Sequence, residues 1–146
     1  METQLNSEAV KKEIKLDFKE AKYATGRRKK SIARVWLRKG TGSINVNGKK
    51  MIDYFINQNL QTAVCRPFAV VKRENEFDVK CSVKGGGLTG QAGAIIHGIA
   101  RTLVQFEPEL KQALKKEKLT TRDSRGVERK KYGRRKARRS FQFSKR

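Results

Sequence analysis

The last eighteen residues of this chain, 129–146, have a composition that cannot form a packed core. Ten of them are Lys or Arg and none is acidic. Apolar side chains are too few to offset the conformational entropy that ordering such a segment would cost. The segment therefore requires a partner with dense negative charge, most commonly a nucleic-acid backbone. Its three aromatic rings, Tyr132, Phe141 and Phe143, can stack on bases, which a purely basic segment cannot do.

The formal net charge of +22 is unevenly distributed over the 146 residues. Residues 1–22 carry five basic and five acidic side chains, residues 23–110 carry 15 and 6, and residues 111–146 carry 16 and 3. This asymmetry indicates a polyanionic partner rather than a small acidic substrate. The length allows one modest domain plus tails. We predict an N-terminal extension over 1–22, an α+β RNA-binding domain over 23–118 and an extended basic tail over 119–146.

Several classes of protein are disfavoured. Cys65 and Cys81 are too few for a disulfide framework and lack the spacing of zinc ligands, so we expect small buried thiols in a reducing compartment. His97 completes no usual metal site and has no Ser or Cys nucleophile in register. No apolar run reaches the length of a membrane span, and the acidic N-terminus is unlike a transit peptide. We expect a non-enzymatic cytoplasmic protein with no catalytic residues, metal, cofactor or membrane partner.

The sequence predicts a strand over Tyr23–Arg38, in which the four cations of residues 27–30 precede an alternating part from Ser31. Ala33, Val35 and Leu37 would face one side of it. Arg34, Trp36 and Arg38 would face the other side, where they could lie on RNA. The alternative is that Trp36 covers a second packing surface and that the arginines are merely solvated.

The rest of the chain predicts short strands followed by helices, which is typical of an α+β fold with one sheet face left open. The helix that opens at Gly85 has an apolar stripe, and its Gly93 and Gly98 would allow a close approach by another segment. The expected elements are strands at Ser43–Val46, Pro67–Val71 and Glu76–Val83, turns at Asn47-Gly48 and Asn75, helical pieces at Lys50–Phe55 and Gln58–Val64, and helices from Gly85 to Phe106 and over Glu109–Lys118.

The glycines at Gly85-x-Gly87-x-x-Gly90 match the spacing of a dinucleotide fingerprint. That motif needs a further parallel strand after its helix, and no apolar strand remains in the chain. A P-loop is excluded because no Gly-Lys-Ser or Gly-Lys-Thr is present. Two interpretations stay open: backbone N–H groups at Gly85, Gly86, Gly87 and Gly90 hold an RNA phosphate, or the glycines only permit close helix–sheet packing.

Four stretches of the chain together carry a family resemblance. They are Thr25–Val35, Gly40–Lys49, Gly85–Gly93 continued through His97–Arg101, and Arg122–Arg125 continued through Glu128–Gly133 to Arg146. In this order they resemble the bacterial-type small-subunit ribosomal protein nine family, the universal S-nine family. The resemblance extends from Tyr23 to the C-terminus, and the ending Phe141-Gln-Phe-Ser-Lys-Arg146 makes it highly specific. Ile96 departs from it, because the family usually has a basic residue there.

The resemblance implies a mixed four-stranded sheet with helices mainly on one face and a left-handed βαβ crossover, like the second domain of ribosomal protein S five. It also implies a ribonucleoprotein component of translation, bound to the 3′ major domain of ribosomal RNA (rRNA) in the small-subunit head beside neighbouring head proteins. The tail would pass through that RNA to the anticodon stem-loop of transfer RNA (tRNA) in the peptidyl site. There, Lys145 and Arg146 would make the contact.

The candidate rRNA-binding residues are cations of the folded part and of the tail. They are Arg27, Arg28, Lys29, Lys30, Arg34, Arg38, Lys84, Arg101, Arg122, Arg125, Arg129, Lys130, Lys131, Arg134, Arg135, Lys136, Arg138 and Arg139. The alternatives are a free-standing basic RNA-binding or chaperone protein and a nucleotide-binding module built on Gly85–Gly90. An organellar ribosome is as compatible with the sequence as a bacterial one.

Overall fold

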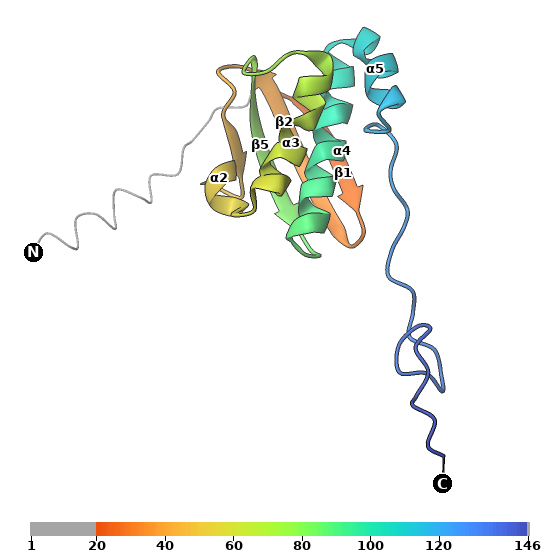
Figure 1. The fold of residues 1–146 in the computed structure, drawn as a ribbon. Helices are drawn as coiled ribbons and strands as arrows, with labels where there is room; N and C mark the ends of the chain where they lie inside the picture. Colours follow the sequence, from red (N-terminus) through yellow and green to blue (C-terminus); the bar gives the residue numbers. More distant parts are fainter. Residues whose placement is uncertain (1–19, 146) are drawn as a thin grey trace, which may run out of the picture.

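A five-stranded mixed sheet organises the computed structural model, which describes residues 20–145 (Figure 1). Its strand order is β1-β2-β5-β3-β4. The strands are β1 Lys22–Arg28, β2 Ser31–Lys39, β3 Ile44–Val46, β4 Lys49–Lys50 and β5 Phe77–Lys84. β1, β2 and β5 pair antiparallel, whereas β3 runs parallel to β5 and antiparallel to β4. The predicted α+β class is confirmed, with five strands instead of four.

The predicted single strand Tyr23–Arg38 is wrong, because the chain forms a hairpin there. β1 ends at Arg28, the chain turns through Lys29 and Lys30, and β2 begins at Ser31. Lys29 takes a left-handed backbone conformation, with φ of 51°, in a turn that contains no glycine. The hairpin places Arg27 and Arg28 on a different strand from Arg34, and it creates a sheet edge at β1.

The predicted strand Pro67–Val71 is also wrong, because these residues end the helix α3, Gln58–Val71. The helix begins at Asn57, whose side chain accepts a hydrogen bond from the Asn59 backbone N–H. Val64, Pro67 and Phe68 are its buried residues, at helical spacing, and the Phe68 ring stacks against Phe77 of β5 at 6.2 Å. Packing of this face therefore outweighs the strand preference of the Val70-Val71 end.

The predicted helix after the glycines is confirmed as α4, Leu88–Phe106. Ile95, Ile99, Thr102 and Leu103 of its predicted stripe are fully buried. A Cβ atom added at Gly98 would lie 2.5 Å from Val35 Cγ2, so this glycine lets α4 pack closely on β2. The structure thus confirms the close approach expected there.

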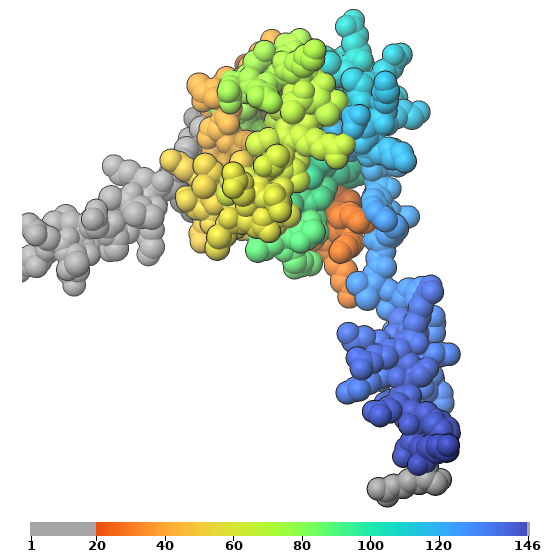
Figure 2. Space-filling model, in the orientation of Figure 1, coloured from red at the N-terminus to blue at the C-terminus, as the bar shows by residue number. Residues whose placement is uncertain are grey.

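The remaining helices are short. The helical piece expected at Lys50–Phe55 is α2, Met51–Tyr54. The helix expected over Glu109–Lys118 is divided into a 3-10 turn η1, Pro108–Leu110, and α5, Lys111–Lys116. Within residues 117–145 no further helix or strand is present, and the later part of this segment projects away from the body (Figures 1 and 2). None of the described helices is long and apolar enough to cross a membrane.

One face of the sheet is buried and the other is open. Helices α3 and α4 cover the first face, where Ala33, Val35 and Leu37 of β2 are fully buried (Figure 1). Ile96, at the position where the resembled family is usually basic, is half-buried and packs against this core. The alternation predicted for β2 is confirmed, and it assigns Arg34, Trp36 and Arg38 to the opposite face, which we call the open face.

Candidate nucleic-acid interface

The strand register arranges polar, basic and aromatic side chains in rows across the open face. Each row takes one residue from β1, one from β2 and one from β5. Two of the three rows carry cations from the predicted set, and the third carries the tryptophan. The rows are Arg27–Ile32–Lys84, Thr25–Arg34–Ser82 and Tyr23–Trp36–Lys80.

Arg34 lies against two neighbouring aromatic rings of this face. Its guanidinium carbon lies 5.0 Å from the centre of the Trp36 ring and 6.0 Å from that of Tyr23. These are cation–π contacts, which hold the guanidinium in place while it remains exposed. The hydrogen bond between Tyr23 Oη and Thr25 Oγ1, at 3.1 Å, lowers the pKa of Tyr23, and Arg34 lowers it further. The predicted arginine thus belongs to a fixed aromatic–cation cluster of Tyr23, Arg34 and Trp36.

Arg38, also predicted, forms an ion pair with Asp78 at 3.2 Å at the end of β2. Asp78 is 5% exposed, and it accepts hydrogen bonds from the backbone N–H groups of Thr41 at 2.9 Å and Ser43 at 3.1 Å. Burial raises the pKa of Asp78, but these N–H donors and Arg38 outweigh it and hold the pKa below its ordinary value. Asp78 therefore fixes the loop between β2 and β3 and positions Arg38.

The turn of the β1–β2 hairpin meets the glycine turn before α4. Gly85 and Gly86 have φ values of 77° and 65°, and the Ser31 hydroxyl donates to the Gly85 carbonyl at 2.9 Å. A Cβ atom at Gly85 would lie 2.5 Å from the Lys30 carbonyl oxygen, and one at Gly90 would lie 2.9 Å from Ser31 Oγ. Close packing accounts for these glycines.

Gly87, by contrast, has nothing within 4 Å of an added Cβ atom, so the phosphate interpretation stays a prediction there. Within residues 20–145 no strand follows α4, which agrees with the rejection of a dinucleotide site. The exposed side chains of Lys29, Lys30 and Lys84 lie close to the turn. Cations of the predicted set thus gather at this end of the molecule.

Two side chains of α4 cover the free edge of β1. The Arg27 backbone N–H donates to His97 Nδ1 at 3.2 Å, and Arg101 donates to the Thr25 carbonyl at 2.6 Å. Burial lowers the pKa of His97, and the neighbouring Arg101 cation lowers it further, which favours the neutral imidazole that can accept the hydrogen bond from the Arg27 backbone N–H. The unpaired N–H and C=O groups of a strand edge promote association between chains. The hydrogen bonds with His97 and Arg101 occupy two of these groups on the β1 edge.

The first residues of the tail, 119–125, lie against the same edge, and we call them the tail root. Asp123 forms ion pairs with Arg28 at 3.0 Å and with Arg125 at 2.8 Å. Arg28 also donates to the Arg125 carbonyl at 3.1 Å, and its stem lies against Gly93 of α4. Hydrogen bonds from Arg125, and then the charges of Arg125 and Arg28, hold the pKa of Asp123 well below its usual range. Two predicted RNA-binding arginines thus fix the direction in which the tail leaves the sheet.

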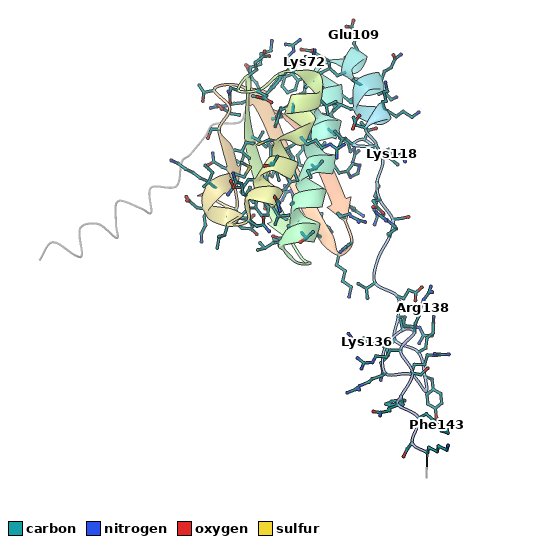
Figure 3. The ribbon with its side chains drawn as sticks, in the orientation of Figure 1. Lys72, Glu109, Lys118, Lys136, Arg138 and Phe143 are labelled. Atoms are coloured by element: carbon teal, nitrogen blue, oxygen red, sulfur yellow. The ribbon has the colours of Figure 1, made fainter. Side chains whose placement is uncertain are left out.

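Further along, residues 128–140 form a compact loop within the tail, which we call the tail loop (Figure 1). Arg138 makes two hydrogen bonds to the Glu128 carboxylate, at 2.8 and 3.0 Å, and these lower the pKa of Glu128. Arg134 donates to the Arg138 carbonyl at 2.9 Å, and Gly133 turns the chain with φ of 70°. Lys136 and Arg138 lie on this loop and Phe143 beyond it, clear of the folded part (Figure 3). The predicted extended tail therefore contains a closed turn.

The structure divides the predicted residues into groups. Lys29, Lys30 and Lys84 gather at the hairpin end, Arg27, Arg34 and Arg38 lie on the open face, and Arg28, Arg101 and Arg125 hold the β1 edge and the tail root. The remaining tail cations are exposed, as is Lys145, whereas Arg146 lies outside the described residues, as do residues 1–19 of the predicted extension. The exposed group is Arg122, Arg129, Lys130, Lys131, Arg134, Arg135, Lys136, Arg138 and Arg139.

Sequence reasoning missed the side chains that position these cations. Asp78, Asp123 and Glu128 each hold an arginine of the predicted set. An isolated acid within a strongly basic segment is a usable signal for Asp123 and Glu128, whereas nothing local marks Asp78. Among residues 20–145 no group of His, Cys, Asp or Glu is placed to hold a metal ion.

The sequence model of the family described as Ribosomal protein S9/S16 matches residues 26–146. The chain belongs to this family. Proteins of the S9/S16 family are structural, and this one is a ribosomal protein of the small subunit that binds rRNA in translation. The match covers the whole open face except Tyr23 and Thr25, and it covers the tail to its last residue. The basic surfaces described above are therefore those of an rRNA-binding protein.

Proposed function

We propose that this ribosomal protein occupies the head of the small subunit on the 3′ major domain of rRNA, beside other head proteins, and that its tail reaches the anticodon stem-loop of peptidyl-site tRNA. The observation that carries the proposal is the contrast along the tail. Its root is held to the β1 edge by Asp123, whereas its later cations are exposed and project away from the folded part (Figure 2). Such an arrangement suits a segment that enters RNA while the folded part stays on its surface.

The folded part, residues 23–118, docks through the hairpin end and the open face. The tail, residues 119–146, neutralises phosphates of RNA helices that would otherwise repel one another. Contacts of this kind position a protein without reading sequence. The proposed location is the cytoplasmic ribosome. Sedimentation of a cell lysate tests it: the protein should travel with small subunits at moderate salt, and migration as a free protein would favour the chaperone alternative.

The tip of the tail, Lys145 and Arg146, contacts the tRNA backbone in this proposal. A guanidinium forms forked, charge-assisted hydrogen bonds with a phosphate. A phosphate contact is blind to base identity, as any tRNA in the peptidyl site requires. Lys145 is exposed, which supports its availability for such a contact.

Deleting Lys145 and Arg146 tests the tip. Subunits reconstituted with the shortened protein should assemble normally but retain peptidyl-site tRNA less tightly in a filter-binding assay. The matched control is the double substitution Arg135→Gln and Lys136→Gln, which removes two cations from the tail loop instead. It should weaken rRNA binding and leave tRNA retention closer to normal. Unchanged tRNA retention after the deletion would contradict the tip assignment.

A further inference from the structure

We propose that the open face of the sheet carries a stacking site for an unpaired RNA base, formed by the aromatic–cation cluster of Tyr23, Arg34 and Trp36. The proposal rests on the rRNA-binding function and adds to it a second mode of contact. Phosphate contacts by the tail and the hairpin end need only charge. A stacking site needs flat rings that are exposed, held in place and surrounded by cations rather than acids.

The two rings are cross-strand neighbours on β1 and β2 and are held in place by their surroundings. Their centres lie 5.3 Å apart and their planes are inclined by 42°, so they meet at an angle and do not cover each other face to face. Tyr23 is 43% exposed and Trp36 is partly exposed. The hydroxyl of Tyr23 is tied to Thr25 by a hydrogen bond, which limits rotation of that ring. Aromatic surface is therefore available at a defined position.

Arg34 strengthens the site. Its guanidinium lies 5.0 Å from the Trp36 ring centre, and its own plane is a surface on which bases stack. The same side chain brings a positive charge that can meet the phosphate next to a stacked base. One cluster can thus serve both parts of a nucleotide.

The charge around the cluster favours a nucleic acid over a protein partner. Arg27 and Lys84 both lie in the row of the open face that adjoins the cluster. The three described rows contain no carboxylate, and Asp78, which lies opposite Arg38 in the next register pair, is 5% exposed and is occupied by the Thr41 and Ser43 backbone and by Arg38. An apolar protein surface would have to desolvate these cations without supplying counter-charges, whereas RNA supplies both rings and phosphates. A duplex keeps its base faces stacked internally, so the ligand is an unpaired nucleotide.

Trp36 is the single tryptophan of the chain, so its fluorescence reports on the cluster directly. The full-length protein is titrated with a short single-stranded oligoadenylate, with binding followed separately by the anisotropy of labelled RNA. Excitation at the red edge of tryptophan absorption avoids the tyrosines. Inorganic polyphosphate is the matched control, because it binds the same cations and has no bases. We expect strong quenching by the RNA and little by polyphosphate at equal saturation.

Substitution provides an independent test. Trp36→Leu should lower the affinity for single-stranded RNA on the order of tenfold, and the dependence on salt should keep its slope because no cation is lost. Ile32→Ala, which removes another exposed apolar side chain of the open face, is the control and should leave affinity unchanged. Circular dichroism confirms that each variant folds; the quenching experiment on the unaltered protein does not depend on them.

The outcomes distinguish failure of the stacking site from failure of the rRNA-binding function. If anisotropy shows RNA bound while Trp36 fluorescence is unchanged, rRNA binding stands and the stacking site is refuted, which leaves the open face for a protein partner. Equal quenching by polyphosphate would also refute it, since charge alone would then perturb the cluster. If no RNA binds at all, the rRNA-binding function itself fails.

Discussion

The folded part and the tail of this protein are both rich in cations, but they hold them in different ways. In the folded part a core fixes the strands, and the register of the sheet fixes where Arg27, Arg34 and Lys84 lie. In the tail and directly before it, three acids hold the chain through arginines. Glu117 pairs with Arg66 at 2.7 Å, Asp123 with Arg28 and Arg125, and Glu128 with Arg138.

The difference shows which properties each region can supply. A surface of fixed side chains can recognise shape and bases, because its groups stay in one arrangement. A segment of exposed cations with a few acidic attachment points supplies charge and reach instead. Changes in the core should therefore affect stability and specific contacts, whereas changes in the tail should affect affinity and its dependence on salt.

The largest effect is expected from Gly26→Ala, which separates β1 from α4. A Cβ atom at Gly26 would overlap the Ala94 carbonyl oxygen and would lie 2.5 Å from the Gly98 backbone nitrogen. Because these are backbone atoms that cannot rotate away, the free energy of unfolding should fall by about 3 kcal/mol or more. Thermal unfolding followed by circular dichroism measures the loss.

Gly126→Ala in the tail is the matched control, since an added Cβ atom there meets nothing within 4 Å. It should leave the unfolding temperature unchanged. The Gly26→Ala chain should still bind a polyanion with a steep salt dependence, because its tail cations remain. Equal stability of the two variants would show that β1 and α4 do not pack closely enough at Gly26 to exclude a Cβ atom.

A smaller loss is expected from Asp78→Asn, which weakens the support of the β2–β3 loop. The change removes a charged acceptor from the Thr41 and Ser43 N–H groups and from Arg38, at a cost of about 1–3 kcal/mol in the free energy of unfolding. Chemical denaturation measures it. Thr41→Val, which keeps the backbone donor and removes only a hydroxyl contact of 3.3 Å, is the control and should cost less.

The same carboxylate predicts a dependence on pH. Its pKa in the folded chain lies below the ordinary value of 3.8. The stabilisation is therefore fully present above that ordinary value and is lost as the pH falls through the folded pKa, because the unfolded chain takes up the proton first. Unfolding of the Asp78→Asn variant should vary less with pH in this acidic range. An identical pH profile would remove Asp78 from the acid response.

The smallest effect is expected from Glu128→Gln, which opens the tail loop and releases Arg138. One more arginine becomes available to phosphate, so the slope of log affinity against log salt should steepen by about 0.7–0.9. Glu109→Gln is the matched control: it changes the net charge equally, but it lies in η1 at the opposite end of the molecule from Arg138 (Figure 3). Equal slopes for the two variants would show that the Glu128–Arg138 pair does not withhold an arginine from RNA.

Sequence patterns predicted the elements whose side chains face a core over many residues. The alternation in β2 extends over the whole strand and the apolar stripe of α4 over the helix from Ile95 onward, and both are confirmed by buried residues such as Val35 and Ile99. In such elements the period of the pattern and the packing agree. Glycines at points of close approach, such as Gly98, were also recognisable, because the sequence placed them inside a helix.

The β1–β2 turn and the end of α3 could not be predicted from the local sequence. The β1–β2 turn has Lys29 in a left-handed conformation without the Asn-Gly or Asp-Gly pair that usually marks a hairpin. The end of α3 has the composition of a strand, and only its packing against Phe77 of β5 and against α4 makes it helical. In both cases contacts distant in sequence override local preference.

The sequence predicted which cations belong to the candidate interface, but it did not predict how they are arranged in space. Arg34 and Trp36 were assigned to one face, whereas Tyr23 joined them only because the chain turns back at Lys29. The pairing of Arg28 with Asp123 joins residues that are far apart in the sequence, and no pattern in a single sequence reveals such a pair.

The salt dependence of binding to small-subunit rRNA tests most directly whether the tail supplies most of the charge-driven affinity. The full chain is compared with a chain that ends at Glu128, which lacks ten cations of the tail. If each cation meets a phosphate, the slope of log affinity against log salt should be shallower by about 7 to 9 in the shortened chain. An unchanged slope would contradict the claim that the tail supplies most of the charge-driven affinity, and it would place the phosphate contacts on the folded part.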